Sequence, residues 1–475
     1  MKVRERKGGR EMGSRLDLNE YLGKEIPCSC GRTHSANVRL VDIDRDATKR
    51  LPDHIRNFGY ENVYLVADKN TWEAAGKEAE TVLKEAGLPC KSLVLDYDEL
   101  VPDETVIGEI LVGYPKEADL ILAVGSGTIN DLCKFISFQV GVDYMIFASA
   151  PSMDGFVSDG SALMLNHVKT TIQVHGPVAV IGDTDILAAA PMNMITAGLG
   201  DTIGKYTCLL DWKLSQIING EYYCDEVVGM VHQALQTVME QSDKIEKRDP
   251  DAIKAVTEAL VLTGMAMSFV GYSRPASGCE HHLSHYWEMK FIMEGKKPIL
   301  HGTKVGVGMI TALKLYHMLE KEKIDFEAAK KKKFDQDGWL AKIRACYGEA
   351  ADGIIKLEEK CQKNDVDARN KRLAVMKEKW PLIQKTIKES LPKTEEMEQL
   401  FLSLDAPVNP EQIGLSLELV EDGILIAKEV RDRYTLLQML WDLDLSEDYA
   451  KKVVDYFAKD QTLYFRWLES KKGLQ

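Results

Sequence analysis

The chain has 475 residues, 45% of them hydrophobic and 28% charged, and its 60 Lys and Arg against 74 Asp and Glu give a net charge of −14. The length and composition predict two large domains, and the negative charge argues against a general nucleic-acid binder. No apolar run reaches the roughly 20 residues that span a bilayer, and the nine cysteines are scattered. We therefore expect a cytoplasmic protein without membrane insertion, and not a secreted precursor.

The N-terminal half predicts an α/β domain. Residues 1–20 are expected to be disordered or frayed. From about residue 60, short apolar runs alternate with amphipathic stretches, the pattern of βαβ units. Strands are predicted at 63–67, 93–95, 120–124 and 144–147, with helices near 71–86, 103–115 and 129–140. Because these runs are apolar on both faces, they suit a parallel sheet covered by helices. Three further runs, at 162–165, 170–174 and 178–181, predict a β-hairpin extension.

The C-terminal half predicts helices alone. After Pro191, which fits the first turn of a helix, no further strand is expected. The predicted divisions are the frayed segment 1–20, an α/β domain over 21–188 and an all-α domain over 189–475.

A glycine-rich junction follows the strand predicted at 120–124. Gly125, Ser126, Gly127, Thr128 and Asp131 lie where this strand enters a helix. Glycines allow close approach to the backbone, and free N–H groups at a helix start favour an anionic oxygen. Asp131 occupies the third-glycine position of the usual dinucleotide motif, so a simple turn with Thr128 as N-cap is an equal alternative.

A second polar junction, 149–158, follows the next strand and contains Ser149, Ser152 and Ser158. Both junctions should meet at the carboxyl edge of the sheet, where open α/β sheets bind ligands. Asp68 ends the strand at 63–67. It suits either a ribose or adenine contact or a helix N-cap.

Asp201 and a histidine cluster predict a metal site. Asp201 lies among small residues on a predicted buried helix, where a carboxylate is costly unless it is paired or coordinated. His281 and His285 share one helical face, and His301 follows at a bend. One carboxylate with two or three imidazoles suits a divalent transition metal. The residues alone do not decide which histidines are ligands.

Cys28, Cys30 and His34 also lie close together in the sequence. They lack a fourth ligand and the usual C-x₂-C spacing of zinc sites. The sequence therefore favours a turn with unligated thiols.

Several of these motifs resemble the bacterial branch of the sn-glycerol-1-phosphate dehydrogenases. This branch belongs to the superfamily of iron-containing alcohol dehydrogenases, glycerol dehydrogenases and dehydroquinate synthases. The resemblance rests on five segments, 125–131, 150–156, 197–201, 273–289 and 301–306. It implies a Rossmann-like domain for NAD(P), a dehydroquinate synthase-like helical domain with a divalent metal, an active site in the cleft between them, and a homodimer.

The resemblance also implies roles for individual residues. The metal ligands, which are catalytic, would be Asp201, His281 and His301. The substrate would contact Asp154 and His285, and its phosphate would need cations, for which the candidates are Lys205, Lys304 and Lys169. The pyrophosphate would lie against Gly125, Ser126, Gly127, Thr128 and Asp131, and the nicotinamide side against Ser149, Ser152 and Ser158.

The expected reaction is hydride transfer between NAD(P)H and dihydroxyacetone phosphate, giving sn-glycerol 1-phosphate for phospholipid biosynthesis. The metal would act as a Lewis acid on the ketone oxygen, and His285 or a water that it orients would supply the proton. The alternatives are a glycerol or polyol dehydrogenase, a dehydroquinate synthase-like lyase and a non-enzymatic binding protein. The sequence leaves open the choice among Ni, Zn and Fe, and between NADH and NADPH.

Overall fold

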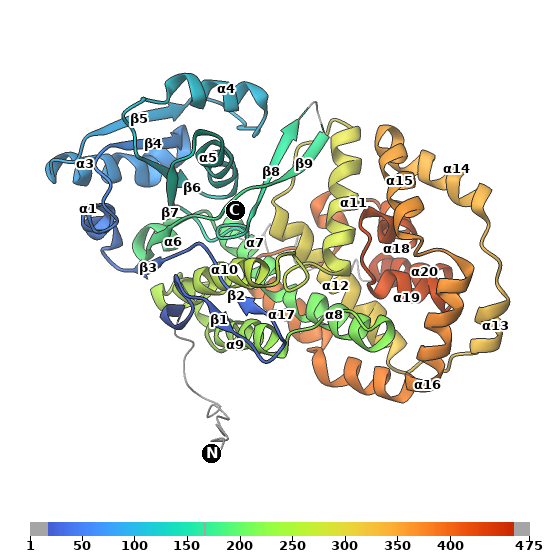
Figure 1. Ribbon diagram of the computed structural model, residues 1–475. Coiled ribbons are helices and arrows are strands. Elements are labelled where there is room, and N and C mark those ends of the chain that lie inside the picture. The colour runs from blue at the N-terminus through green and yellow to red at the C-terminus, as the bar shows by residue number, and fades with distance from the viewer. Residues whose placement is uncertain (1–17, 166–167, 460–475) are drawn as a thin grey trace, which may run out of the picture.

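The computed structural model describes residues 18–165 and 168–459, in an α/β part followed by a helical part (Figure 1). The α/β part is built on a six-stranded sheet in the order β3-β10-β7-β6-β4-β5, with every neighbouring pair parallel. The strands of this sheet are β3 Leu40–Asp44, β4 Val63–Asp68, β5 Cys90–Leu95, β6 Leu120–Gly125, β7 Asp143–Ala148 and β10 Ala179–Asp183. Every residue of β6 and β10 is buried, as expected for central parallel strands.

Helices connect and cover these strands. They are α1 Ala47–Asn57, α2 Lys69–Thr71, α3 Lys77–Glu85, α4 Glu104–Gly113, α5 Gly127–Val140 and α6 Thr184–Ala189, with a π-helical turn at Trp72–Gly76. Two antiparallel hairpins stand apart from the sheet, β1 Ile26–Pro27 with β2 Thr33–His34, and β8 Gly160–Leu165 with β9 Val168–Gln173. The parallel sheet, its helices and the hairpin extension confirm the predicted α/β architecture.

The structure corrects two strand predictions. The run predicted at 178–181 as part of the hairpin is β10, which lies between β3 and β7 in the main sheet. Its continuous burial suits this central place, whereas β8 alternates between buried and partly exposed residues. The sequence reading also missed β3, whose polar residues Asp42 and Asp44 interrupt the apolar pattern.

The second part contains helices, and among the described residues no strand follows β10. Its first six helices are α7 Met192–Ile203, α8 Lys205–Asn219, α9 Asp225–Gln241, α10 Pro250–Val270, α11 Cys279–Met293 and α12 His301–Leu319. The later helices are α13 Phe326–Lys331, α14 Gln336–Tyr347, α15 Ala351–Cys361, α16 Val366–Ser390, α17 Thr394–Ser403, α18 Leu417–Ile426, α19 Leu436–Asp442 and α20 Ser446–Lys459. Pro191 is the N-cap residue of α7, one position before the first turn in which the sequence placed it.

Two further features bear on the sequence predictions. Within the described ranges, α10 is the one helix long and apolar enough to cross a membrane, and 83% of its most apolar window is buried inside the protein, as in a core helix. Of the segment predicted to be frayed, residues 1–17 lie outside the described residues, and Leu18–Glu20 form a 3₁₀ turn.

The strand order positions a ligand site. The chain places β5 on one side of β4 and β6 on the other, so the direction of winding reverses between β4 and β6. Ligands of open α/β sheets bind outside the carboxyl ends of strands at such a reversal. Asp68 ends β4 and Gly125 ends β6, which places two of the predicted cofactor residues at this point.

Candidate active site

Three helices of the second part bring together Asp201, His281 and His301. Asp201 lies near the end of α7, His281 in the first turn of α11, and His301 begins α12. One donor atom from each side chain lies within 4.8 Å of the other two, and His281 Nε2 is 3.6 Å from Asp201 Oδ1. Asp201 is fully buried. Two imidazoles and a carboxylate at this spacing form a donor set for a divalent transition metal.

Glycines allow the close helix contacts that form this cluster. A Cβ atom on Gly302 of α12 would lie 1.9 Å from the Ala197 carbonyl oxygen of α7. A Cβ atom on Gly198 would lie 1.8 Å from the Pro151 carbonyl oxygen, in the loop that follows β7. Both contacts exclude any larger residue, so α7 packs directly against α12 and against the edge of the α/β part.

Glu280 orients His281. Its Oε1 accepts hydrogen bonds from His281 Nδ1 and from the Gly278 N–H, both at 2.7 Å. Its Oε2 accepts one from the Thr207 hydroxyl. With Nδ1 held as a donor, His281 presents an unprotonated Nε2 toward Asp201. A carboxylate behind a ligating histidine is a common supporting arrangement in metal sites.

The site favours the protonation states that bind a metal. Burial lowers the pKa of His281 to about 3, with Lys205 acting in the same direction, and burial holds the pKa of His301 well below its usual value. Burial acts to raise the pKa of Asp201, but the charge of Lys205 and the nearby histidines hold it below its ordinary range. Neutral imidazoles and an ionised carboxylate are the forms that coordinate metal, so the residues fit a divalent ion.

A buried ion pair links this cluster to the α/β part. Lys205 Nζ lies 2.8 Å from Asp201 Oδ1 and 2.7 Å from Asp154 Oδ2, and Asp201 Oδ2 accepts the Asp154 backbone N–H at 3.0 Å. Burial and the Asp201 charge raise the pKa of Asp154 to about 6. Lys205, a sequence candidate for the substrate phosphate, is fully buried and already paired with two carboxylates.

His285 lies beside the cluster and faces a second group of charges. Its ring centroid is 6.1 Å from that of His281 and 5.8 Å from that of His301. Its Nδ1 lies 3.7 Å from Glu288 Oε2, and burial lowers the pKa of His285 to about 4. Glu288 also pairs with Lys169 of β9 at 2.7 Å and with Lys304 of α12 at 2.8 Å.

The two predicted cofactor junctions contact each other. Ser126 donates its hydroxyl to the Ala150 carbonyl, and the Ser126 and Ser152 hydroxyls are hydrogen-bonded to each other. Ser126 is the N-cap residue of α5 but makes no capping bond with its side chain. The helix begins at Gly127, so Thr128 is not the N-cap that the alternative reading required.

The other junction residues take different places. The Ser149 N–H donates to the Gly125 carbonyl, which joins the two strand ends. The Asp131 carboxylate accepts the Ala162 N–H of β8, and the Ser158 hydroxyl lies within hydrogen-bonding distance of the Gly155 carbonyl and of the Gly160 carbonyl at the start of β8. These last two side chains support the hairpin rather than the start of α5.

Asp68 is the N-cap of α2, the second of its two sequence readings. Its Oδ1 accepts the N–H groups of Asn70 and Thr71, and the Thr71 hydroxyl oxygen accepts the Asp68 N–H. The neighbouring Lys69 pairs with Asp98 at 2.6 Å.

Sequence reasoning missed three residues of this region, Lys134, Glu280 and Glu288. Lys134 of α5 is fully buried and donates to the Gly155 and Gly160 carbonyls, which holds the loop that contains Asp154. The sequence feature that could have identified Lys134 is a lysine on the apolar face of an amphipathic helix. Glu280 and Glu288 were visible only as acidic residues close to the histidines.

Comparisons with known proteins agree with this architecture. Residues 42–191 match the family model of iron-containing alcohol dehydrogenases. The chain is 33% identical over 417 residues to the glycerol-1-phosphate dehydrogenase [NAD(P)+] of Halalkalibacterium halodurans, covering 87% of this chain and 95% of the relative. It is 31% identical to the enzyme of the same name from Geobacillus stearothermophilus, covering 90% and 98%.

A solved structure extends the likeness to the fold. A probable glycerol dehydrogenase from Sinorhizobium meliloti matches with a TM-score of 0.57 at 12% identity, covering 89% of this chain and 98% of that one. The sequence relatives are similar over nearly their whole length. The chain therefore belongs to the glycerol-1-phosphate dehydrogenase family, in its bacterial branch, within the iron-containing alcohol dehydrogenases.

Proposed function

We propose that the protein interconverts dihydroxyacetone phosphate and sn-glycerol 1-phosphate by hydride transfer with NAD(P). The observation that carries this proposal is the Asp201, His281 and His301 cluster, which is joined through Lys205 and Asp154 to the edge of the parallel sheet. A metal-binding donor set beside a dinucleotide-type sheet edge is what a metal-dependent dehydrogenase requires.

The cofactor would lie across the carboxyl ends of β4 and β6. The pyrophosphate would meet Gly125, Ser126, Gly127 and Thr128, where the first N–H groups of α5 have no side-chain cap. Ser149 and Ser152 would lie toward the nicotinamide and Asp68 toward the ribose. Lys69, the cation that follows Asp68 in the chain, is paired with Asp98, so a 2′-phosphate of NADPH would have to compete for it. We therefore propose NADH as the better cofactor.

Asp201, His281 and His301 would hold one Ni, Zn or Fe ion. When bound, that ion supplies Lewis acidity at the ketone oxygen of the substrate. Glu280 keeps His281 in the tautomer that binds, and the surrounding burial excludes water. Lys205 holds Asp154 and Asp201 at fixed positions, which lets Asp154 meet the substrate from the α/β side.

The substrate would extend from this cluster toward His285. Lys169 and Lys304, paired through Glu288, leave one net positive charge beside His285, and we propose that they bind the phosphate. His285, whose lowered pKa keeps it neutral, would contact the substrate and pass a proton from water to the new hydroxyl. Asp131 and Ser158, also predicted to touch the cofactor, would act by fixing the hairpin.

The decisive experiment is NADH oxidation with dihydroxyacetone phosphate after chelation and re-addition of Ni²⁺, Zn²⁺ or Fe²⁺. Activity should disappear on chelation and return with at least one metal, and the product should be the sn-1 and not the sn-3 phosphate. Faster turnover of glycerol than of glycerol 1-phosphate would instead identify a polyol dehydrogenase. Cofactor binding without net NADH consumption would indicate a lyase of the dehydroquinate synthase kind.

We also propose a homodimer in the cytoplasm whose product enters phospholipid biosynthesis, as the family resemblance implies. Light scattering on the purified protein measures the mass in solution and tests the dimer directly.

A further inference from the structure

A second cluster of potential metal ligands lies outside the active site. It consists of Cys28, Cys30 and His34 from the segment around the β1–β2 hairpin, and of Cys224, which precedes α9. One donor atom from each of the four lies within 4.8 Å of the others. Cys224 supplies the fourth donor whose absence led the sequence reading to favour a turn with unligated thiols.

The distances match those of a tetrahedral zinc site. Cys28 Sγ and Cys224 Sγ are 3.6 Å apart, and His34 Nε2 is 3.4 Å from Cys30 Sγ and 3.5 Å from Cys224 Sγ. Zn–S bonds of about 2.3 Å and Zn–N bonds of about 2.0 Å in a tetrahedron place sulfur atoms about 3.8 Å apart, and sulfur about 3.5 Å from nitrogen. Three of the six donor pairs therefore already have the separations that a zinc ion would impose, and the other three pairs lie within 4.8 Å.

The His34 ring is held in the tautomer that a metal requires. Its Nδ1 lies 2.8 Å from the Phe269 carbonyl oxygen at the end of α10. A carbonyl oxygen only accepts hydrogen bonds, so Nδ1 carries the proton and Nε2 presents its lone pair to the thiols. The ring is buried and stacks on the Phe269 ring at 5.6 Å.

The backbone around Cys28 and Cys30 forms a tight turn that directs an N–H group at a sulfur atom. The Cys28 N–H bonds to the Arg32 carbonyl, and the Cys30 N–H points at Cys28 Sγ at 3.5 Å. Gly31 has a φ of +84°, a conformation that favours glycine. An N–H directed at sulfur is a hydrogen bond that can support a metal-bound cysteine.

We propose that Cys28, Cys30, His34 and Cys224 bind a structural zinc ion, separate from the catalytic metal. Three thiolates and one imidazole complete a four-coordinate shell from protein alone, which is the mark of a structural site. The active-site cluster offers three protein ligands and no sulfur, which leaves a position for substrate. The two sites thus differ in both ligand chemistry and role.

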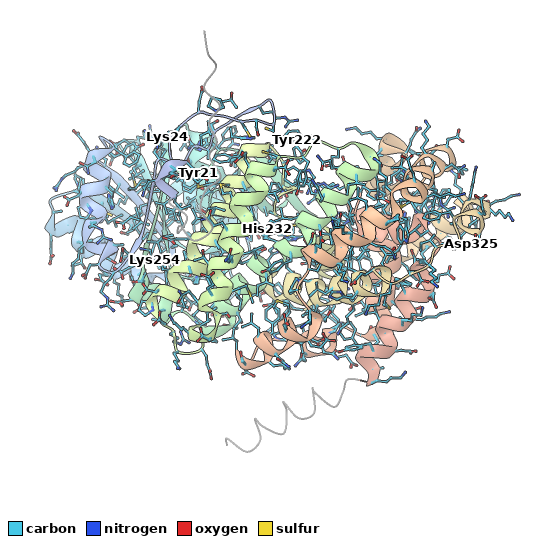
Figure 2. All side chains as sticks on the ribbon, turned by 90° about the horizontal axis from the view of Figure 1, so that it is seen from below. Tyr21, Lys24, Tyr222, His232, Lys254 and Asp325 are labelled. Atoms are coloured by element: carbon cyan, nitrogen blue, oxygen red, sulfur yellow. The ribbon has the colours of Figure 1, made fainter. Side chains whose placement is uncertain are left out.

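The ion would fasten the N-terminal hairpin to the helical part. In Figure 1, β1 and β2 lie beside α9 and α10, two helices that come much later in the chain. Tyr222, which contacts Cys30 Sγ through its hydroxyl, lies on the same side of the molecule as Tyr21, whose ring is 6.1 Å from that of Phe269 (Figure 2). The zinc ion would thereby also hold the end of α10. The Ser268 hydroxyl of this helix donates to the Val157 carbonyl in the loop after β7.

The test uses X-ray absorption at the zinc edge on full-length protein purified with Zn²⁺. The His281→Ala variant, with its catalytic ligand set broken, should retain zinc with a sulfur shell at about 2.3 Å. The Cys224→Ser variant should lose this shell and melt at a lower temperature. Cys90→Ser removes a thiol outside the cluster and should leave both unchanged, as a matched control.

Cobalt substitution gives a second readout that does not need the variant to fold. In wild-type protein, Co²⁺ at this site should produce intense thiolate-to-metal charge-transfer absorption, which the Asp–His cluster cannot give. A thiol-specific mercurial should release the zinc. If wild-type protein shows no sulfur-ligated zinc and no such cobalt band, or if a Cys28–Cys224 disulfide is found instead, the proposal is overturned.

Discussion

Glu280 and His281 are consecutive residues of α11, and Glu280 Oε1 accepts the His281 Nδ1 hydrogen bond at 2.7 Å. Oε1 also accepts the Gly278 N–H, and Oε2 accepts the Thr207 hydroxyl. Glu280 is fully buried and is not one of the three proposed metal ligands. Its role is therefore to position the imidazole of its neighbour.

The Glu280→Gln variant tests that positioning role. The amide keeps the shape of the side chain but removes the charge that strengthens the His281 donor. We expect metal affinity to fall about 10- to 100-fold, with turnover recovering at saturating metal. A titration of activity against free metal measures the shift, and an unchanged midpoint would contradict the role.

The Asp201→Asn variant removes the charge of the metal set while keeping the volume of the side chain. Lys205 retains Asp154 as a partner, so the fold should persist. We expect metal loss and turnover reduced by about 10²-fold or more, the scale of losing a key electrostatic group. Elemental analysis measures the bound metal, and circular dichroism checks that the fold persists. Full metal content with full turnover would exclude Asp201 from the site.

His281→Ala and His285→Ala should fail in different ways, although the two residues share a face of α11. Loss of the proposed ligand His281 should lower bound metal and with it turnover. Loss of His285 should leave metal content intact and raise KM for dihydroxyacetone phosphate, with a lower kcat if the proton passes through it. If the purified His285→Ala variant contains no metal while the His281→Ala variant retains it, then His285 is the ligand and His281 the substrate contact.

The Lys304→Met variant tests the phosphate site. Hydrogen bonds to charged groups are worth about 1.5–3 kcal/mol, so KM for dihydroxyacetone phosphate should rise about 10- to 100-fold. Unphosphorylated dihydroxyacetone serves as the matched control substrate, and its kcat/KM should change little. Equal losses for both substrates would show that Lys304 supports the fold or the metal cluster instead.

Asp42 of β3 links stability to pH. Burial acts to raise its pKa, but bonds from His54 and Arg50 hold it well below its usual range. A carboxyl with a depressed folded pKa stabilises the protein above its unfolded pKa of about 3.9, and this stability is lost as the pH falls through the folded value.

The Asp42→Asn variant should therefore lose about 2 kcal/mol of unfolding free energy at neutral pH, and the difference from wild type should shrink below about pH 4. Asp53→Asn on the exposed face of α1 removes the same charge as a control and should cost under about 0.5 kcal/mol. Denaturant unfolding at several pH values measures both. A constant difference across pH would show that the Asp42 charge is not responsible.

The sequence predicted those parts of the fold that depend on local pattern. Continuous apolar runs marked β4, β6 and β7, and the helical periodicities after Pro191 were confirmed. The edge strand β3 escaped because alternate positions carry Asp42 and Asp44, which pair with Arg50, His54 and Lys254. β10 follows the hairpin in the chain, but its partners β3 and β7 are set by long-range pairing.

The residues of the candidate sites also divide into those that local sequence pattern identified and those that it did not. Asp201 and the histidines stood out because a buried carboxylate and clustered imidazoles are rare without a function. Glu280 and Glu288 were not identified because an acidic residue on a helix is most often a solvated one. Cys224 lies 190 residues from His34, and no spacing rule joins such a pair.

The contact between Cys28 and Cys224 also bears on the unfolded chain. These two residues are 196 positions apart, and the segment between them contains the entire parallel sheet. A metal clip at this point would close one long loop and restrict the conformations open to the denatured protein. By the chain-entropy relation for cross-links, that restriction is on the order of 5 kcal/mol. A cross-link between Cys28 and Cys224 would thus stabilise the α/β domain although neither residue belongs to a strand of its parallel sheet.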